Sequence, residues 1–166
     1  MTVLPDVLIR DLAVVFCGSA VGAASAKRRA YYAGPGNAFW PTLAEVGLTP
    51  HRLKPEECES VTRHGLGLTD LAKTVSGQDS ILRKAHFDIE GLRAKMHEYR
   101  PRILAFTSKR AGREFVGHPV DYGRLSDTIS DTILFVLPSP SGAARRYWSE
   151  EPWLELARLM RRSPGA

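Results

Sequence analysis

The chain has 166 residues, of which 43% are hydrophobic and 25% are charged, and it carries a formal net charge of +5. This composition excludes a disordered chain, no apolar run is long enough to span a membrane, and the length suits one domain with its own core. The positive charge favours an anionic partner, nucleic acid above all, although many proteins that bind no nucleic acid carry a similar charge.

Short apolar runs alternate with amphipathic segments. In chain order, the sequence predicts a buried strand over 12–17, helices over 37–46, 55–64 and 88–99, a strand over 103–106, a helix over 108–116, a strand over 133–137 and a helix over 153–162. The first ten residues and the tail 163–166 are expected to be loose ends. Strands separated by helices favour an α/β fold. We therefore expect a single domain over residues 1–166, a three-layer α/β/α sandwich around a mostly parallel, roughly four-stranded sheet.

Two glycine-containing loops follow apolar strands near opposite ends of the chain. The first, residues 18–25, offers small residues and backbone N–H groups that suit a ligand, or it is an ordinary tight connection, since it matches neither a Walker loop nor a complete dinucleotide-binding fingerprint. The second, residues 138–146, combines prolines, serines and paired arginines that suit phosphates or bases, or it is a solvated basic turn. Because ligands bind beyond the carboxyl ends of strands in α/β sheets, we expect both loops to face one site.

Further segments between these loops carry candidate site residues. In residues 31–37 two adjacent tyrosines precede a Gly-Pro-Gly turn, and Tyr32 could stack on a nucleobase or pack beneath the loop. In residues 65–71 a loop flanked by glycines carries Asp70, which could orient or deprotonate a water, or cap a turn or helix. The basic run 27–29 could contact a DNA backbone or form a solvated surface.

Other chemistries find little support in the sequence. The five histidines show no metal-ligand spacing, and Ser141 is not in a nucleophile elbow. Cys17 and Cys58 are too few for a disulfide framework or an all-cysteine iron–sulfur site, which favours two reduced thiols in a cytosolic protein. The first eleven residues carry charges and no long apolar core, so they do not form a signal peptide.

Taken together and in order, these segments resemble the mismatch-specific uracil/thymine DNA glycosylases of the uracil-DNA glycosylase superfamily, from about residue 12 to the last helix. The first family motif, Gly-Ile-Asn-Pro-Gly, is matched by Gly18-Ser19-Ala20-Val21-Gly22, and the family's Pro-x-Asn-x-Phe-Trp run by Pro35-Gly36-Asn37-Ala38-Phe39-Trp40. The second motif, Asn-Pro-Ser-Gly-x-x-Arg, is similar to Ser139-Pro140-Ser141-Gly142-Ala143-Ala144-Arg145. Ser25 and Tyr32 match a family serine and the aromatic residue that stacks on the flipped base. The Phe-Trp run and the Pro-Ser-Gly motif are specific as a pair.

The chain also departs from the family pattern. Ala20 stands where the family has its catalytic asparagine, so the positioning of water must move elsewhere or be lost. Ala143 and Ala144 stand where the family has the wedge that fills the gap in the duplex. The segment Gly67-Leu68-Thr69-Asp70-Leu71 matches a form in which some members use the aspartate, so the resemblance implies that Asp70 is the catalytic residue.

The resemblance implies a monofunctional glycosylase of base-excision repair, which flips out and excises uracil, or another deaminated or mismatched base, and leaves an abasic site. It implies DNA as the partner, no cofactor, no metal, no membrane, a monomer, and a cytoplasmic protein of bacterial type that joins the nucleoid during repair. The implied base-binding residues are Gly18, Ser19, Ala20, Ser25, Tyr32 and Asn37, and the implied DNA-binding residues are Ser108, Lys109, Ser139, Pro140, Ser141, Gly142, Ala143, Ala144 and Arg145. The alternatives are a protein of the same fold that binds uracil or abasic DNA without cutting it, and an unrelated nucleotide-binding α/β enzyme.

Overall fold

A five-stranded sheet forms the centre of the protein in the computed structural model, which describes residues 1–162. The strands are β1 (Val14–Val21), β2 (Leu66–Ser76), β3 (Ile103–Phe106), β4 (Gly123–Ile129) and β5 (Thr132–Val136), in the order β2-β1-β3-β5-β4. All neighbours are parallel except β4, which runs antiparallel to β5. The expected α/β fold with a mostly parallel sheet is confirmed, with five strands rather than four.

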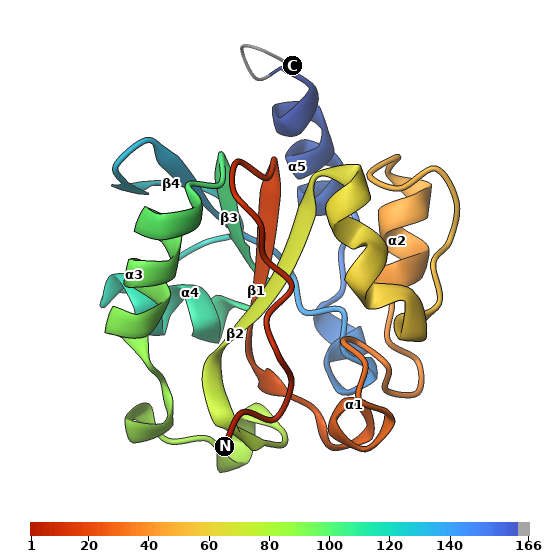
Figure 1. Cartoon of the computed structure of the whole chain (residues 1–166), viewed down its shortest axis with the longest axis vertical. Coiled ribbons are helices and arrows are strands. Elements are labelled where there is room, and N and C mark those ends of the chain that lie inside the picture. The colour runs from red at the N-terminus through yellow and green to blue at the C-terminus, as the bar shows by residue number, and fades with distance from the viewer. Residues whose placement is uncertain (163–166) are drawn as a thin grey trace.

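Helices cover both faces of this sheet (Figure 1). One apolar core joins the sheet to α3 (Ile89–Tyr99) and α4 (Lys109–Val116), and the other joins it to α2 (Phe39–Glu45), the 3₁₀ helix η1 (Pro55–His64) and α5 (Glu151–Arg161). The short helix α1 (Ala23–Arg28) follows β1 near the carboxyl ends of the parallel strands. None of the helices within residues 1–162 has the length and apolar character needed to cross a membrane.

Local sequence signals account for most of these helices. The Asp88 carboxylate accepts a hydrogen bond from the Gly91 backbone N–H at 2.9 Å and begins α3. Ser108 Oγ accepts a hydrogen bond from the Ala111 N–H at 3.1 Å and begins α4 in the same way. The predicted helices therefore form close to their predicted bounds, and the strand predicted over 103–106 has the bounds of β3.

Strand β2 corrects the prediction of a loop around Asp70. Its glycines suggested a turn, yet Gly67 lies inside the strand, where a Cβ would come within 2.8 Å of the Val7 carbonyl oxygen. Glycine is needed there because another segment of backbone crosses closely, and no turn is required. The prediction of a loop beginning at Gly18 is also wrong, because β1 continues through Val21.

The backbone that crosses close to Gly67 belongs to the N-terminal segment. The expectation that the first ten residues are loose is therefore wrong. Val7 and Leu68 exchange two backbone hydrogen bonds of 2.9 Å, and the Val3 N–H donates to the Lys73 carbonyl oxygen at 2.8 Å. Leu4 is buried in the core. The segment therefore packs along the outer side of β2, an edge strand of the sheet (Figure 1). The predicted loose tail, 163–166, lies outside the described residues.

Strand β4 was not predicted from the sequence. It lies at the other edge of the sheet, and only its two ends, Gly123 and Ile129, are buried. Between them exposed polar residues alternate with half-buried ones, and Leu125 is the one apolar residue, so the strand lacks the apolar run that marks a buried strand.

Candidate functional site

A cavity of about 670 Å³ lies beyond the carboxyl ends of the parallel strands, where the two glycine-containing segments, residues 18–25 and 138–146, meet. Segments far apart in the chain form its wall: the end of β1, the loop before α2, the start of α4 and the loop after β5. Fourteen of the expected site residues line it, namely Gly18, Ser19, Ala20, Ser25, Tyr32, Asn37, Asp70, Ser108, Ser139, Pro140, Ser141, Gly142, Ala143 and Ala144. The fold therefore brings these residues to one place, as expected from the parallel sheet.

Two of the expected DNA-binding residues fall outside this lining within residues 1–162. Lys109 Nζ lies 4.5 Å from the centre of the Tyr122 ring. Arg145 lies against the turn before α2, since a Cβ on Gly36 would be 2.8 Å from Arg145 Nη2. Their contacts with phosphate remain predictions.

Asp70 lies in the buried part of β2, where it pairs in register with Gly18 of β1. Its side chain is 4% exposed, and among residues 1–162 its Oδ2 is the one buried side-chain oxygen or nitrogen without a hydrogen-bond partner. Burial raises the pKa of Asp70 to about 7, the charge of Lys73 opposes this rise and that of Asp6 adds to it. A buried carboxylate with a free lone pair is ready to accept a hydrogen bond from a ligand or a water.

Gly18 packs closely against this carboxylate. A Cβ at position 18 would lie 2.8 Å from Asp70 Oδ1, 3.5 Å from Thr107 Oγ1 and 3.7 Å from the Tyr32 hydroxyl oxygen, so there is no room for a side chain at this position. Gly18, Tyr32, Asp70 and Thr107 all line the cavity. A water or a polar ligand atom that enters this part of the cavity can therefore meet several polar partners, as a bound water requires.

Tyr32 is held rigidly at the cavity wall. One face of its ring stacks on Phe39 with centroids 3.8 Å apart and planes 15° apart, and its hydroxyl forms a 3.1 Å hydrogen bond with Thr107 Oγ1. Its backbone has φ of 53°, a left-handed conformation that tertiary contacts must stabilise. The sequence analysis missed Thr107, although its position directly after the buried strand β3 was a signal for a site residue.

Three other expected base-binding side chains have structural partners. Ser25 Oγ accepts a hydrogen bond from the Ala33 N–H at 2.8 Å, and Asn37 Oδ1 accepts one from the Phe39 N–H at 2.9 Å. Ser19 Oγ lies 3.3 Å from Ser108 Oγ, in a hydrogen bond that either hydroxyl can donate. These contacts fix the loops that surround the cavity, and roles in base recognition remain predictions.

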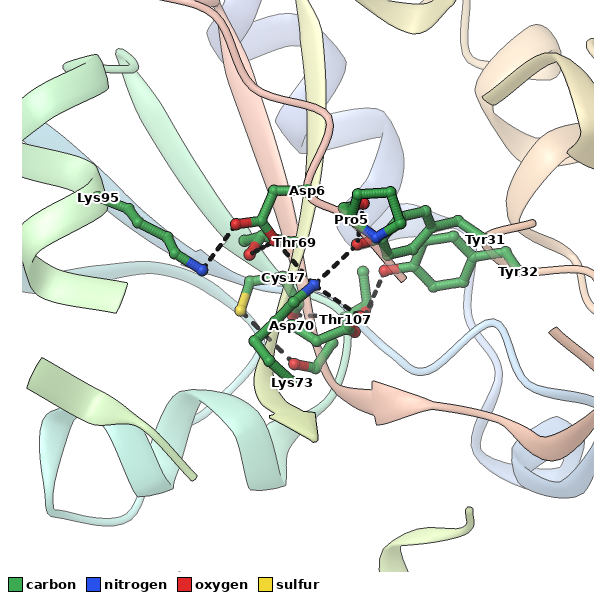
Figure 2. A network of polar contacts seen from close by, with 11 residues as sticks. Pro5, Asp6, Cys17, Tyr31, Tyr32, Thr69, Asp70, Lys73, Lys95 and Thr107 are labelled. Carbon is green, nitrogen blue, oxygen red and sulfur yellow. Dashed lines mark hydrogen bonds and ion pairs between the residues drawn. The ribbon is translucent and has the colours of Figure 1, made fainter. Parts of the chain in front are cut away.

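A network of charged groups behind Asp70 was also missed (Figure 2). Lys73 Nζ lies 2.7 Å from Asp6 Oδ1 and 3.9 Å from Asp70 Oδ2, and Lys95 Nζ lies 2.6 Å from Asp6 Oδ2. Asp70 and Lys73 lie three residues apart in the sequence, but neither the strand that they share nor the approach of Asp6 from the N-terminal segment was predicted. Within residues 1–162, no cluster of three or more His, Cys, Asp or Glu side chains is arranged to hold a metal ion.

The raised pKa of Asp70 predicts how stability depends on pH. Its ordinary value is 3.8, so the unfolded chain releases this proton near pH 4 while the folded protein retains it up to about pH 7. The free energy of unfolding therefore falls as pH rises through this window. Asp70→Asn removes the ionisable group. A rise in pKa from 3.8 to about 7 corresponds to about 4 kcal/mol, and 1 kcal/mol moves the Tm of a chain of this length by about 2–4 °C, so we expect the Tm of Asp70→Asn to exceed that of the wild type by roughly 10 °C at pH 8.

Calorimetry from pH 4 to 9 measures this effect. The difference in Tm between Asp70→Asn and the wild type should grow up to about pH 7 and then level off. Asp79→Asn is the matched control, because Asp79 also lines the cavity but is exposed. A difference in Tm that is constant across this pH range would contradict the assignment of the pKa.

The chain is similar to known proteins both in sequence and in structure. The family model of the uracil DNA glycosylase superfamily matches residues 5–160. A solution NMR structure of a candidate uracil DNA glycosylase from Methanosarcina acetivorans superposes with a TM-score of 0.64 and 24% sequence identity, covering 95% of this chain and 96% of that one. At this identity, the structural match is evidence for the fold.

Proposed function

Because this chain belongs to the uracil DNA glycosylase superfamily, we propose that it is a monofunctional DNA glycosylase that excises uracil and leaves an abasic site. The single observation that carries this proposal is the buried carboxylate of Asp70 in the wall of the cavity, whose Oδ2 has no hydrogen-bond partner. The match of the Phe-Trp run and the Pro-Ser-Gly motif supports a place among the mismatch-specific uracil/thymine enzymes, which would extend the substrates to other deaminated or mismatched bases.

The proposed chemistry starts with extrusion of the damaged nucleotide into the cavity, which costs a few kcal/mol. Cleavage of the N-glycosidic bond passes through a sugar-centred cation, and the ionised Asp70 carboxylate stabilises this positive charge. Asp70 and Thr107 both line the cavity, so a water bound there can be oriented by the Asp70 carboxylate. Asp70 thereby replaces the asparagine that the family carries at the position of Ala20.

The rim of the cavity supplies the proposed contacts with DNA. Ser108 at the start of α4, and Ser139 to Gly142 after β5, present hydroxyl and backbone groups that suit phosphates. Lys109 and Arg145 lie next to this rim in the sequence and add positive charge. Ala143 and Ala144 at the edge are too small to fill the gap that a flipped base leaves in the duplex. This favours weak discrimination of the base on the opposite strand.

Incubation with uracil-containing duplexes and single strands, followed by alkali, tests the proposal. Strand breaks at uracil support a glycosylase, and a panel with thymine opposite guanine, xanthine and hypoxanthine defines the range of bases. Ala20 at the asparagine position favours a second candidate, a protein that binds uracil or abasic DNA without cutting. Tight binding without alkali-sensitive breaks would favour that second candidate.

Tyr32 gives a prediction about base stacking. Phe39 fixes one face of its ring, and the residue lines the cavity, where the ring is available to a flipped base. Tyr32→Ala is expected to weaken transition-state binding by about 1–3 kcal/mol, measured as the loss in kcat/KM on uracil DNA.

Tyr32→Phe is the matched control, since it retains the ring and loses the 3.1 Å hydrogen bond with Thr107. It should keep kcat/KM within a few-fold of the wild type. If Tyr32→Ala and Tyr32→Phe lower kcat/KM equally, the effect comes from the hydroxyl and the stacking assignment fails.

A further inference from the structure

The ammonium group of Lys73 contacts three side chains in the network of Figure 2. It lies 2.7 Å from Asp6 Oδ1, 3.1 Å from the Tyr31 hydroxyl oxygen and 3.9 Å from Asp70 Oδ2. The first two distances are those of hydrogen bonds, whereas 3.9 Å is too long for one. Lys73 therefore acts on Asp70 through its charge and leaves the Oδ2 lone pairs unoccupied.

Asp6 is the group that keeps Lys73 at this distance. It accepts hydrogen bonds from Thr69 Oγ1 at 2.7 Å and from Lys73, and its other oxygen pairs with Lys95 of α3 at 2.6 Å. Burial alone would raise the pKa of Asp6, but these donors outweigh it and lower the pKa below its usual value. Asp6 is thus an anchored, ionised carboxylate that competes with Asp70 for the lysine.

We propose that Lys73 is a positioning residue for Asp70, and that Asp6 holds it close enough to compensate the charge of the reactive carboxylate but too far to bond to it. This inference rests on the proposed function, in which Asp70 is the reactive group. The arrangement allows the Asp70 carboxylate to be buried, ionised and still a base. An isolated carboxylate at 4% exposure resists ionisation, while a carboxylate bonded directly to lysine would be a weak base.

Among the titratable groups around Asp70, Lys73 does most to favour its ionised form. Around the carboxylate lie Cys17 of β1, Tyr31 and Tyr32 of the loop after α1, Asp6 of the N-terminal segment, Lys95 of α3 and Lys73 of β2 itself. The two cations both lower the pKa of Asp70, and Lys73 has the larger effect, while Asp6 raises it. Removing Lys73 or Asp6 should therefore shift the titration of Asp70 in opposite directions.

The first test measures the single-turnover rate of uracil excision against pH. The wild-type rate should rise with pH to a plateau above about pH 7, as Asp70 ionises. Lys73→Met should raise the midpoint by about one pH unit or more, so that the rate at pH 7 falls about fivefold or more and recovers at high pH. Lys73→Arg should restore the midpoint, and Lys54→Met, which removes an exposed lysine outside the cavity, should leave it unchanged.

The second test uses Asp6→Asn, which lets Lys73 approach Oδ2. The midpoint should then fall, and the plateau rate should also fall several-fold because the carboxylate becomes a weaker base. A merely structural role for the network would lower the plateau in both variants without moving either midpoint. That result, or midpoints that move in the same direction, would overturn the proposal.

Carbon-13 NMR titration of the Asp70 carboxyl group gives a readout that needs no excision. The same opposite shifts in Lys73→Met and Asp6→Asn are expected in the protein without DNA. If a variant does not fold, Lys73→Gln and Asp6→Ser replace it in this titration. Absence of excision with the NMR shifts intact would refute the proposed function alone, whereas excision with unmoved titrations would refute the role of Lys73.

Discussion

Asp70→Asn is expected to lower the single-turnover rate of uracil excision by about 10²–10⁴-fold, the largest effect on activity that the site predicts. Asparagine has nearly the same shape, but its neutral amide neither stabilises a sugar cation nor takes a proton from water. Asp70 is the buried carboxylate of the cavity lining, so no other residue can easily take over its role. The rate should be measured with enzyme in excess over a uracil duplex.

Two controls separate lost chemistry from lost structure. The affinity of Asp70→Asn for uracil DNA should remain within a few-fold of the wild type, because the proposed DNA contacts lie on the rim. Asp79→Asn removes an exposed carboxylate from the lining of the same cavity and should keep a nearly normal rate. A rate for Asp70→Asn within tenfold of the wild type would end the assignment of Asp70 as the catalytic residue.

Trp153→Ala is expected to lower the free energy of unfolding by about 3–5 kcal/mol, the largest effect on stability. Its side chain is fully buried, and its ring stacks on Phe16 of β1 and meets Phe39 edge to face, both with centroids 5.9 Å apart. Its indole N–H donates to the Pro138 carbonyl oxygen at 3.3 Å. Truncation would leave a cavity between α5 and the sheet and release the start of the loop after β5.

Urea unfolding of the two proteins measures this loss. Trp148→Ala is the matched control, because Trp148 packs on Trp153 with centroids 5.7 Å apart but is only partly buried, so its loss should be smaller. Trp153→Phe should recover much of the stability, since it keeps a ring against Phe16. A change below about 1 kcal/mol in Trp153→Ala would show that the core relaxes around the missing ring.

The site was only partly predictable for a physical reason that β2 illustrates. Glycine favours turns in the local chain, so 65–71 suggested a loop around Asp70. In the fold, the absence of a side chain at Gly67 instead lets the N-terminal segment pack against β2 and form backbone hydrogen bonds with it. Local preference could not reveal this crossing because it depends on a segment about sixty positions earlier in the chain.

The sequence by itself determined the parts of the protein that depend on neighbouring residues. Apolar runs predicted β1, β3 and β5, and Asp88 and Ser108 predicted the starts of two helices. The order of the motifs pointed to the superfamily that the family model shows. These features can be predicted because capping, periodicity and the order of motifs are written in consecutive residues.

Only the tertiary structure decided the state of Asp70. Its burial, the close packing against Gly18, and the approach of Lys73, which Asp6 binds, arise where β1, β2 and the N-terminal segment meet. A pKa near 7 depends on the loss of water around the carboxylate and on charges a few ångströms away. These are properties of the space around the residue, so the sequence could name the carboxylate and only the fold could set its pKa.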